Sequence, residues 1–520
     1  MPSIEQLFQR YGPAYRWFAT ATTMVATISV VLSTTIVNVA IPDVMGAFGI
    51  SQVQAQWLST GFLAAMTATM LMTDWAYRAF GQRTSMIAAL TIFSAGSVLG
   101  GMAPDESILT LARVIQGAAA GLVQPLAMTL LFQVFPPNQR GAAMGIFGVG
   151  VVLAPALGPW IGGMLIDSFN WRYVFYLGIP FAAGGIVLSQ LFLPTREHAG
   201  PRPGFDWIGA GLLCAFLALL LDALTNAQRQ GWGSDPILLQ FALAAIAASS
   251  FILWENHTSK PMLDLRLFAN LPFAAASLVA FIMGAGLFGS TYLLPLFVQT
   301  IQGLTPTQAG LLLMPSGFAL VLVFPIAGRL SDRFPAGLLI GGGMALFAYS
   351  SYLTGAIEIN TGFWTIAWWT VLSRIGLGLV FPALTAGSLR VLPHALVAQG
   401  SGAMNFVRQL GGAFGVNLLA IFLERQTMFH ADALTATQTS DNPATMTLLS
   451  QVAGLAQTAN LPDMQQMPFA ITYLAQSIAL QANTLAFRDG FMVVMFVFLL
   501  ALFPTYLLHR AQRQANMRTN

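Results

Sequence analysis

The feature that most constrains this chain is a recurring apolar run about as long as a membrane is thick. A membrane helix needs roughly 20 mostly apolar residues, and fourteen such stretches can be marked between charged or Gly/Pro-rich segments. They cover residues 17–42, 55–77, 84–104, 107–135, 140–166, 172–193, 206–225, 236–254, 273–300, 307–330, 336–356, 363–391, 399–424 and 487–509. Only 8% of the 520 residues are charged, against about 25% in soluble proteins. The sequence predicts an all-α integral membrane protein with fourteen transmembrane helices.

Lys and Arg are distributed unevenly between the two sides that these spans define. Of the 22 basic residues, fifteen fall in loops and tails on the side of the amino terminus, four on the opposite side and three inside spans. Short loops rich in Lys and Arg stay in the cytoplasm. We therefore expect both termini in the cytoplasm.

The two halves of the chain repeat each other. Gly-Leu-Val-Gln-Pro at 121–125 recurs as Gly-Leu-Val-Phe-Pro at 378–382, and Ala-Ala-Met at 142–144 matches Gly-Ala-Met at 402–404. The two offsets, 257 and 260 residues, are nearly equal, which predicts two six-helix bundles related by an axis along the membrane normal. Spans seven and eight are then inserted between the bundles. The predicted units are 1–194, 195–256 and 257–520.

Two segments fall outside this symmetric arrangement, spans seven and eight and the external segment 425–486, and the sequence leaves their roles open. The simpler interpretation of spans seven and eight is a lipid-facing spacer. The external segment 425–486 is rich in Ala, Gln, Thr, Leu and Met, and no Lys or Arg occurs between Arg425 and Arg488. That composition favours amphipathic helices over disorder. It predicts either a docking surface for a partner or a self-packed cap over the outer vestibule.

Charged residues inside the spans are the strongest functional candidates, because an ionisable group in a membrane is costly. Arg113 in the fourth span is the clearest case, with a structural tie between helices as the alternative. Arg374 and Arg408 have the same two interpretations. No Asp or Glu lies in the middle of a span; Asp222 and Glu424 approach the outer ends.

The fifth span is dense in glycine and proline. Small residues allow helix backbones to approach closely, and neighbouring helices tolerate a proline kink. We expect a flexing helix that packs tightly between the two bundles. Its key positions are Gly150, Pro155, Gly158, Pro159, Gly162 and Gly163.

These motifs resemble those of the fourteen-helix drug:proton antiporters of the major facilitator superfamily, the multidrug exporters of bacteria. The resemblance covers nearly the whole chain and is most specific in the fifth span. It includes Leu-Ala-Arg-Val-Ile-Gln-Gly at 111–117, the stretch 35–42, an Asn-x-x-Arg-Gln-x-Gly-Gly pattern from 405 and the loop 328–333. It implies a major-facilitator-type fold with two six-helix bundles and two inserted helices.

The resemblance also implies roles for individual residues. Transport or coupling roles fall to Asn38, Arg113, Gln116, Asn405 and Arg408, and the span-five glycines and prolines receive a conformational role. Gly328, Asp332 and Arg333 form the loop gating motif. We add Asp222 as a candidate proton carrier, because it is an acid near a span end.

Two positions depart from the family pattern. Ser33 stands where the family usually has an Asp, and the loop 73–81 keeps little of its motif beyond Gly81. The expected function is export of amphipathic small molecules or drugs by alternating access, with proton antiport implied by the resemblance. The alternative is a facilitator or exchanger on the same fold without proton coupling. The resemblance further implies the bacterial inner membrane and a periplasmic adaptor protein that contacts 425–486.

Other classes of function fit the sequence poorly. Interior arginines without a deep carboxylate favour neutral or weakly acidic substrates over dications. The five histidines lie in loops or at a span end, and none is paired with an acid in a manner that suggests catalysis, so an enzyme is not expected. The one cysteine, Cys214, excludes a Cys-based metal site, and the scattered basic residues predict no nucleic-acid binding. We expect no cofactor; the expected partners are the substrate, the proton and the lipid bilayer.

Overall fold

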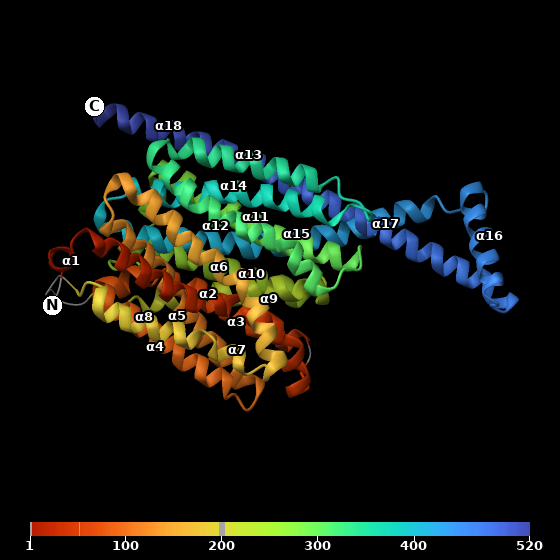
Figure 1. Ribbon diagram of the computed structural model, residues 1–520, viewed down its shortest axis with the longest axis horizontal. Helices are drawn as coiled ribbons and strands as arrows, with labels where there is room; N and C mark the ends of the chain where they lie inside the picture. Colours follow the sequence, from red (N-terminus) through yellow and green to blue (C-terminus); the bar gives the residue numbers. More distant parts are fainter. Residues whose placement is uncertain (1–2, 51, 197–202, 520) are drawn as a thin grey trace.

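The computed structural model describes residues 3–50, 52–196 and 203–519, which form helices and their connections without a β-strand (Figure 1). Within these residues, twelve helical segments are long and apolar enough to cross a membrane. The all-α membrane fold predicted from the sequence is therefore confirmed. The count of fourteen spans stays a prediction, since α3 and α6 are not among the twelve.

The first group of helices lies within the predicted unit 1–194. Its α-helices are α1 (Ile4–Tyr11), α2 (Tyr15–Phe48), α3 (Gln52–Met70), α4 (Thr73–Gly101), α5 (Glu106–Val134), α6 (Arg140–Ser168), α7 (Tyr173–Tyr176) and α8 (Gly178–Phe192). Two short 3-10 helices, η1 (Gly12–Ala14) and η2 (Pro137–Gln139), connect them. Helix α5 packs against α3 and α4, while α2 packs against α6 and α8.

The last group of helices has an equivalent arrangement. It contains η3 (Leu265–Ala269), α11 (Leu271–Thr300), α12 (Pro306–Arg333), α13 (Ala336–Thr354), α14 (Phe363–Arg390), η4 (His394–Leu396), α15 (Val397–Ala436), α16 (Pro443–Thr458), α17 (Asp463–Leu500) and α18 (Leu502–Thr519). Helix α14 packs against α12 and α13, and α15 packs against α11 and α17. In each group the helix that carries the repeated Gly-Leu-Val-x-Pro sequence, α5 or α14, contacts two others extensively.

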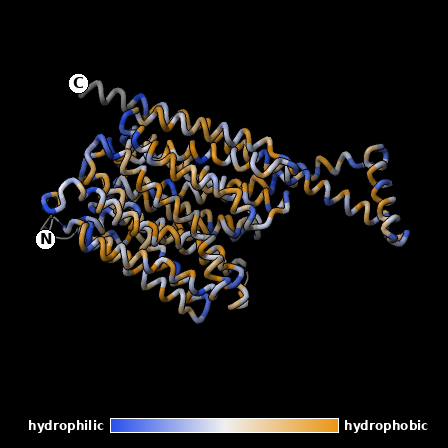
Figure 2. The backbone as a smooth tube through the Cα atoms, in the orientation of Figure 1, coloured by the Kyte–Doolittle hydropathy of each residue, from blue (hydrophilic) through white to orange (hydrophobic). Residues whose placement is uncertain are grey.

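Both chain termini lie at one end of the molecule, which we call the terminal end (Figure 1). The opposite end, the α16 end, carries a projection made of the ends of α15 and α17 with α16 between them. Apolar residues dominate the long helices, and hydrophilic residues gather at the two ends and on parts of the projection (Figure 2). This distribution is what a membrane requires of a helical bundle.

The inserted helices α9 (Trp207–Gln230) and α10 (Asp235–His257) pack mainly against each other. Helix α9 also contacts α3 of the first group and α15 of the second. Helix α10 exposes large apolar side chains such as Leu239, Ile246 and Leu253. The inserted pair therefore combines a lipid-compatible outer helix with an inner helix that contacts both groups.

The segment after α3 differs from the sequence prediction. Residues 78–83 were expected as a loop, yet α4 is helical from Thr73 and only breaks at Gly81. Gly81 has φ 81° and ψ 169°, and the backbone nitrogen of Arg196 lies 2.7 Å from where a Cβ would stand. A side chain at this position would meet both a strained backbone and a steric clash. Gly81 thus allows the connection after α8 to cross α4 closely.

Candidate functional site

Arg113 lies fully buried in α5 and joins three helices. Its Nε donates to the carbonyl oxygen of Leu58 at 2.9 Å, and Nη1 donates to Ser33 Oγ and to Gln116 Oε1, each at 2.8 Å. The guanidinium carbon lies 4.1 Å from the ring centroid of Phe62. Nη2 has no hydrogen-bond partner among the described residues. The charge is thus stabilised by neutral acceptors and a ring face, with one donor left over.

Gln116 extends this network to a fourth helix. Its Nε2 donates to Ser97 Oγ on α4 at 2.8 Å while its Oε1 accepts from Arg113. The sequence analysis named Gln116 and Arg113 as parts of one motif, and the structure shows a hydrogen bond between their side chains. Ser33 bonds to Arg113 from α2 at the position where the resemblance expects an Asp, so the guanidinium contacts a hydroxyl there instead of a carboxylate. The side chain of Asn38 lies outside the described part of the chain.

Arg408 on α15 forms a second buried site at the contact with α5. Its Nη2 donates to Asn405 Oδ1 at 2.9 Å and to Gln124 Oε1 at 3.3 Å, across the boundary between the two helix groups. Asn405 Nδ2 contacts Met128 Sδ at 2.9 Å. The guanidinium carbon is 5.7 Å from the Phe381 ring centroid. Arg408 and Asn405, which the resemblance assigns to one motif, are therefore hydrogen-bonded to each other at the contact between α15 and α5.

Arg374 is the third buried arginine, and it lies apart from the other two sites. Its Nη2 donates to Thr291 Oγ1 at 2.9 Å, which joins α14 to α11, and its Nη1 has no hydrogen-bond partner among the described residues. None of the ion pairs between described residues includes Arg113, Arg374 or Arg408. The interior therefore contains three guanidinium groups without a paired carboxylate.

The glycines of the fifth predicted span lie on two faces of α6. A Cβ on Gly158 would meet Thr35 Oγ1 at 2.6 Å, and one on Gly162 would meet Ile36 Cγ1 at 2.6 Å, so both face α2 of the same group. Gly150 also faces α2, with Met24 atoms at 3.4 Å or more, and Gly163 has open space around it. The side chains of Pro155 and Pro159 lie outside the described residues.

Contact between the two groups is made by other glycines of α6. A Cβ on Gly145 would meet the carbonyl oxygen of Phe324 on α12, and one on Gly141 would meet Ser331 Oγ. Helix α6 as a whole packs against α2 of its own group and α12 of the other, whereas Gly158 and Gly162 lie on the half of α6 that faces α2. The inter-bundle approach uses the first turns of the helix instead.

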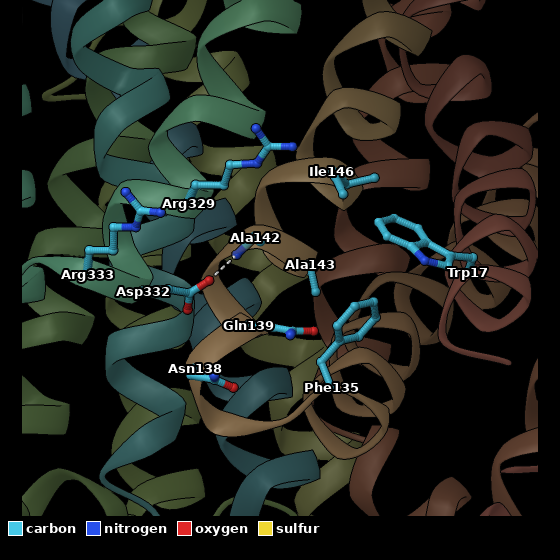
Figure 3. A pocket seen from close by; sticks show the side chains of 10 residues that line it. All are labelled: Trp17, Phe135, Asn138, Gln139, Ala142, Ala143, Ile146, Arg329, Asp332 and Arg333. Atoms are coloured by element: carbon cyan, nitrogen blue, oxygen red, sulfur yellow. Dashed lines mark hydrogen bonds between the residues drawn. The ribbon is translucent and has the colours of Figure 1, made fainter. Parts of the chain in front are cut away.

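Asp332 fastens α12 to the beginning of α6. Its Oδ1 accepts from the backbone N–H of Gly141 and its Oδ2 from that of Ala142, both at 2.8 Å (Figure 3 shows the second bond). Arg390 Nη2 donates to Asp332 Oδ1 at 2.7 Å and to the carbonyl oxygen of Pro137 at 2.9 Å. A carboxylate at a helix N-terminus satisfies free N–H groups and meets the positive end of the helix dipole. Asp332 therefore acts as the cap of a helix in the other group.

The two remaining residues of the predicted loop motif lie beside this cap, in the last turns of α12 and not in a loop. A Cβ on Gly328 would meet the carbonyl oxygen of Gly141 at 2.5 Å, so a glycine is required for the close approach of α12 and α6. Arg333 is exposed and borders a cavity of about 560 Å³ together with Arg329 (Figure 3). The complete lining comprises Trp17, Phe135, Asn138, Gln139, Ala142, Ala143, Ile146, Arg329, Asp332 and Arg333.

Asp222 does not join these sites. It accepts from Asn226 Nδ2 and from Gln240 Nε2, both at 2.7 Å, and so ties α9 to α10. Its place in α9 lies toward the α16 end, within the inserted pair. The structure thus separates Asp222 from the Arg113 and Arg408 networks with which the sequence analysis grouped it.

Several contributing residues escaped the sequence analysis. Ser97, Phe62 and Leu58 complete the Arg113 network, and Gln124 and Met128 complete that of Arg408. The internal repeat contained a signal for Gln124, because this residue occupies the same place in the repeated Gly-Leu-Val-x-Pro sequence as Phe381. In the structure both Gln124 and Phe381 lie beside Arg408. The neutral Ser, Leu and Phe positions carried none, because such residues fill most membrane helices.

Comparison with known proteins places this architecture in a family. The model of the Major Facilitator Superfamily matches residues 23–416. The chain belongs to the Major Facilitator Superfamily, and it is accordingly a transporter of small molecules and not an enzyme.

Individual relatives narrow the comparison. The chain is 31% identical over 466 residues to the uncharacterised MFS-type transporter YhcA of Bacillus subtilis (strain 168), covering 89% of this chain and 87% of the relative. It is 29% identical over 480 residues to the multidrug export protein EmrB of Escherichia coli (strain K12), covering 92% of each. The solved structure of the human organic anion transporter MFSD10 shares the fold, with a TM-score of 0.58 at 13% identity over 93% of this chain and 99% of that one.

Proposed function

We propose that this transporter exports neutral or weakly acidic amphipathic molecules, drugs included, by alternating access. The observation that carries the proposal is the set of three buried arginines, Arg113, Arg374 and Arg408, without a carboxylate partner among the described residues. Such an interior is electropositive and repels a dication during passage. The multidrug exporters among the relatives support export as the direction.

The cavity at the terminal end supports the same class of substrate. Trp17, Phe135 and Ile146 supply apolar wall, and Arg329 and Arg333 supply positive charge at its edge (Figure 3). An amphipathic acid matches both parts, because its apolar body packs on the rings and its charge faces the guanidinium groups. The cavity is therefore a candidate entry site for a molecule arriving from the inner leaflet.

The distribution of contacts between the groups supports alternating access. Asp332 with α6, Gly145 with Phe324 and Arg408 with Gln124 all lie in the half toward the terminal end. A rocking motion that opens this end must break these contacts. We propose that the structure represents the state closed to the cytoplasm, with both termini on the cytoplasmic side of a bacterial inner membrane.

The full count of fourteen spans is part of this proposal. Helix α3 has 19 residues and overlaps the predicted range 55–77 as far as Met70, while α6 has 29 residues and covers the predicted range 140–166. A span of about 20 residues suffices to cross the hydrocarbon. We propose the units 1–194, 195–256 and 257–520 as two six-helix bundles with an inserted pair.

Proton antiport is the proposed energy source, and facilitated exchange is the second candidate. The bond from Arg113 to Ser33 favours the second, because a Ser hydroxyl cannot take up and release a proton near neutral pH as an Asp does. Asp222 stays a candidate proton carrier. The relatives named as multidrug exporters favour the first candidate through the family resemblance.

Transport into inverted membrane vesicles tests the substrate class. We expect uptake of 8-anilinonaphthalene-1-sulfonate, an acidic amphiphile, or Nile red, a neutral one, and no uptake of dicationic propidium. A pH gradient, acid inside the vesicle, should accelerate uptake several-fold if protons are exchanged and leave it unchanged for a facilitator. Selective uptake of propidium would contradict the electropositive interior.

The projection is proposed as the contact for a periplasmic adaptor protein, which the family resemblance implies. It exposes apolar side chains, among them Met428, Phe429 and Leu455. Replacing 430–480 with a short Gly/Ser linker should leave vesicle transport intact while whole-cell drug resistance collapses. Loss of vesicle transport would instead identify the projection as a cap of the outer vestibule.

A further inference from the structure

Two buried carboxyl groups lie near each other at the terminal end of the inserted helix pair. Asp206 is the N-cap residue of α9, and Glu255 lies in the last turn of α10. The exposed fractions are 8% for Asp206 and 4% for Glu255. No candidate site in the sequence analysis included either residue, because each stands near a span end where an acid is ordinarily hydrated.

Asp206 has the hydrogen-bond partners of an ionised carboxylate. Its Oδ1 accepts from the backbone N–H of Gly209 and from Trp254 Nε1, each at 2.9 Å, and its Oδ2 lies 3.1 Å from the same indole nitrogen. These groups are donors only. Both oxygens of Asp206 therefore serve as acceptors, and the negative charge is stabilised at the N-terminus of α9.

Glu255 has a different set of contacts. Its Oε2 accepts from the backbone N–H of Leu263 at 3.2 Å, and its Oε1 has no hydrogen-bond partner among the described residues. A Cβ placed on Gly209 would meet both Asp206 Oδ2 and, at 2.9 Å, Glu255 Oε1. The unpartnered oxygen of Glu255 and an oxygen of Asp206 thus border the same small space.

The side chain of Lys260 comes near this pair: its Nζ would lie 2.8 Å from a Cβ on Gly204, two residues before Asp206. None of the ion pairs between described residues includes Asp206 or Glu255. The titratable groups of the connection to α11, His257, Lys260, Asp264 and Arg266, are exposed or half-exposed, and α3 contains no charged residue. Two ionised carboxylates in one buried space repel each other strongly, and this repulsion favours the protonated form of one of them.

We propose that Glu255, with Asp206 as its acceptor, is a proton-binding site on the cytoplasmic side of the inserted helix pair. The carboxylate of Glu255 takes up one proton, and the resulting O–H of the neutral acid donates to Asp206. The charge of the pair changes from two negative charges to one. The ligand is the proton itself, and its use in transport rests on the proton antiport proposed above.

The surroundings connect this site to both helix groups. Trp75 Nε1 on α4 donates to the carbonyl oxygen of Pro203 at 3.1 Å, three residues before Asp206. Gln399 Nε2 on α15 donates to the carbonyl oxygen of Met262 at 3.2 Å, next to Leu263. Loss of the proton makes Glu255 and Asp206 repel, which pushes the ends of α9 and α10 apart. The end of α9 is bonded to α4 of the first group, and the end of α10 is bonded to α15 of the second. Repulsion between the two ends therefore separates the groups on the cytoplasmic side, and binding of the proton favours the state closed to the cytoplasm.

Infrared difference spectroscopy of the full-length protein in lipid nanodiscs tests the site directly. Raising the pH of the wild-type protein should bleach one band of a protonated carboxylic acid. Glu255→Gln should abolish that band, and Asp206→Asn, which removes the neighbouring charge, should keep it but bleach it at lower pH. The matched control is Asp235→Asn, an exposed acid in the first turn of the same helix α10, which should leave the band unchanged.

Hydrogen exchange measured by mass spectrometry supplies a second readout. After correction for the intrinsic effect of pH, exchange in 206–209 and 255–263 should rise several-fold at alkaline pH in the wild type, with no such rise in Glu255→Gln. A carboxylic acid band that persists in Glu255→Gln, or one that Mg²⁺ bleaches at constant pH, would overturn the proposal. A band that behaves as expected in a protein without pH-driven transport would support the proton site and refute the antiport.

Discussion

The cap that Asp332 forms on α6 predicts that one substitution destabilises the closed state. Asp332→Asn keeps an acceptor oxygen but loses the charge that two backbone N–H groups and Arg390 share. A hydrogen bond to a charged group contributes about 1.5–3 kcal/mol, and a charge at a helix N-terminus adds about 0.3–1 kcal/mol. The partly exposed ion pair with Arg390 adds little.

The expected loss is therefore about 2–4 kcal/mol of the free energy that holds the terminal end closed. Each 1.4 kcal/mol corresponds to about a tenfold change in an equilibrium. The ratio of closed to open molecules should fall about 30- to 1000-fold on that basis. A protein that is almost entirely closed would then show a readily detected open population.

Distance measurement between spin labels checks this prediction. The native Cys214 is exposed, so it is first replaced by Ser, and labels are attached at Asn138→Cys and Leu338→Cys, one on each side of the contact. Asp332→Asn should add a population at longer distance. Arg333→Gln, the exposed neighbour without an ion pair among the described residues, is the matched control and should leave the distances unchanged. An unaltered distribution in Asp332→Asn would refute the reasoning that this cap holds the two groups together.

Three further substitutions test the buried sites. Arg113→Ala should reduce vesicle transport at least tenfold at near-normal abundance, whereas full transport would make the residue a structural tie only. Gly158→Leu should abolish transport, because a Cβ at this position already lies 2.6 Å from Thr35 Oγ1. The control is Gly163→Ala, since a Cβ on Gly163 would stand in open space. An active Gly158→Leu protein would show that α6 and α2 pack loosely. Ser33→Asp should pair with Arg113 and introduce or steepen a pH dependence of uptake, and a wild-type protein with the same pH profile would place proton exchange elsewhere.

Sequence reasoning predicted the overall fold from patterns that depend on the bilayer. Apolar runs of about 20 residues indicate helices because such a segment can satisfy its own backbone hydrogen bonds in lipid only as an α-helix, and the buried arginines stood out because charge is rare there. Gly145 and Gly158 show that sequence patterns do not reveal which neighbouring helix a residue faces. Both are glycines of one helix, yet one faces α12 and the other α2, and the side on which a glycine approaches a neighbour depends on helix rotation. Glu255 was missed for a related reason, since its burial depends on a fold of the chain around 258–265 that leaves no periodic signal.

The continuity of α15 and α17 gives the projection a mechanical property. Helix α15 has 40 residues and α17 has 38, which at about 1.5 Å per residue makes each nearly 60 Å long, about twice the hydrocarbon thickness of a bilayer. Neither is interrupted where it leaves the bundle. A tilt of the second bundle by about 10°, an ordinary amplitude for rigid-body transitions, would therefore swing the tip by about 5 Å over a lever arm of roughly 30 Å. A small tilt of the bundle thus produces a larger displacement of the tip. A probe attached to α16 would therefore follow the conformational changes of the transport cycle from outside the membrane.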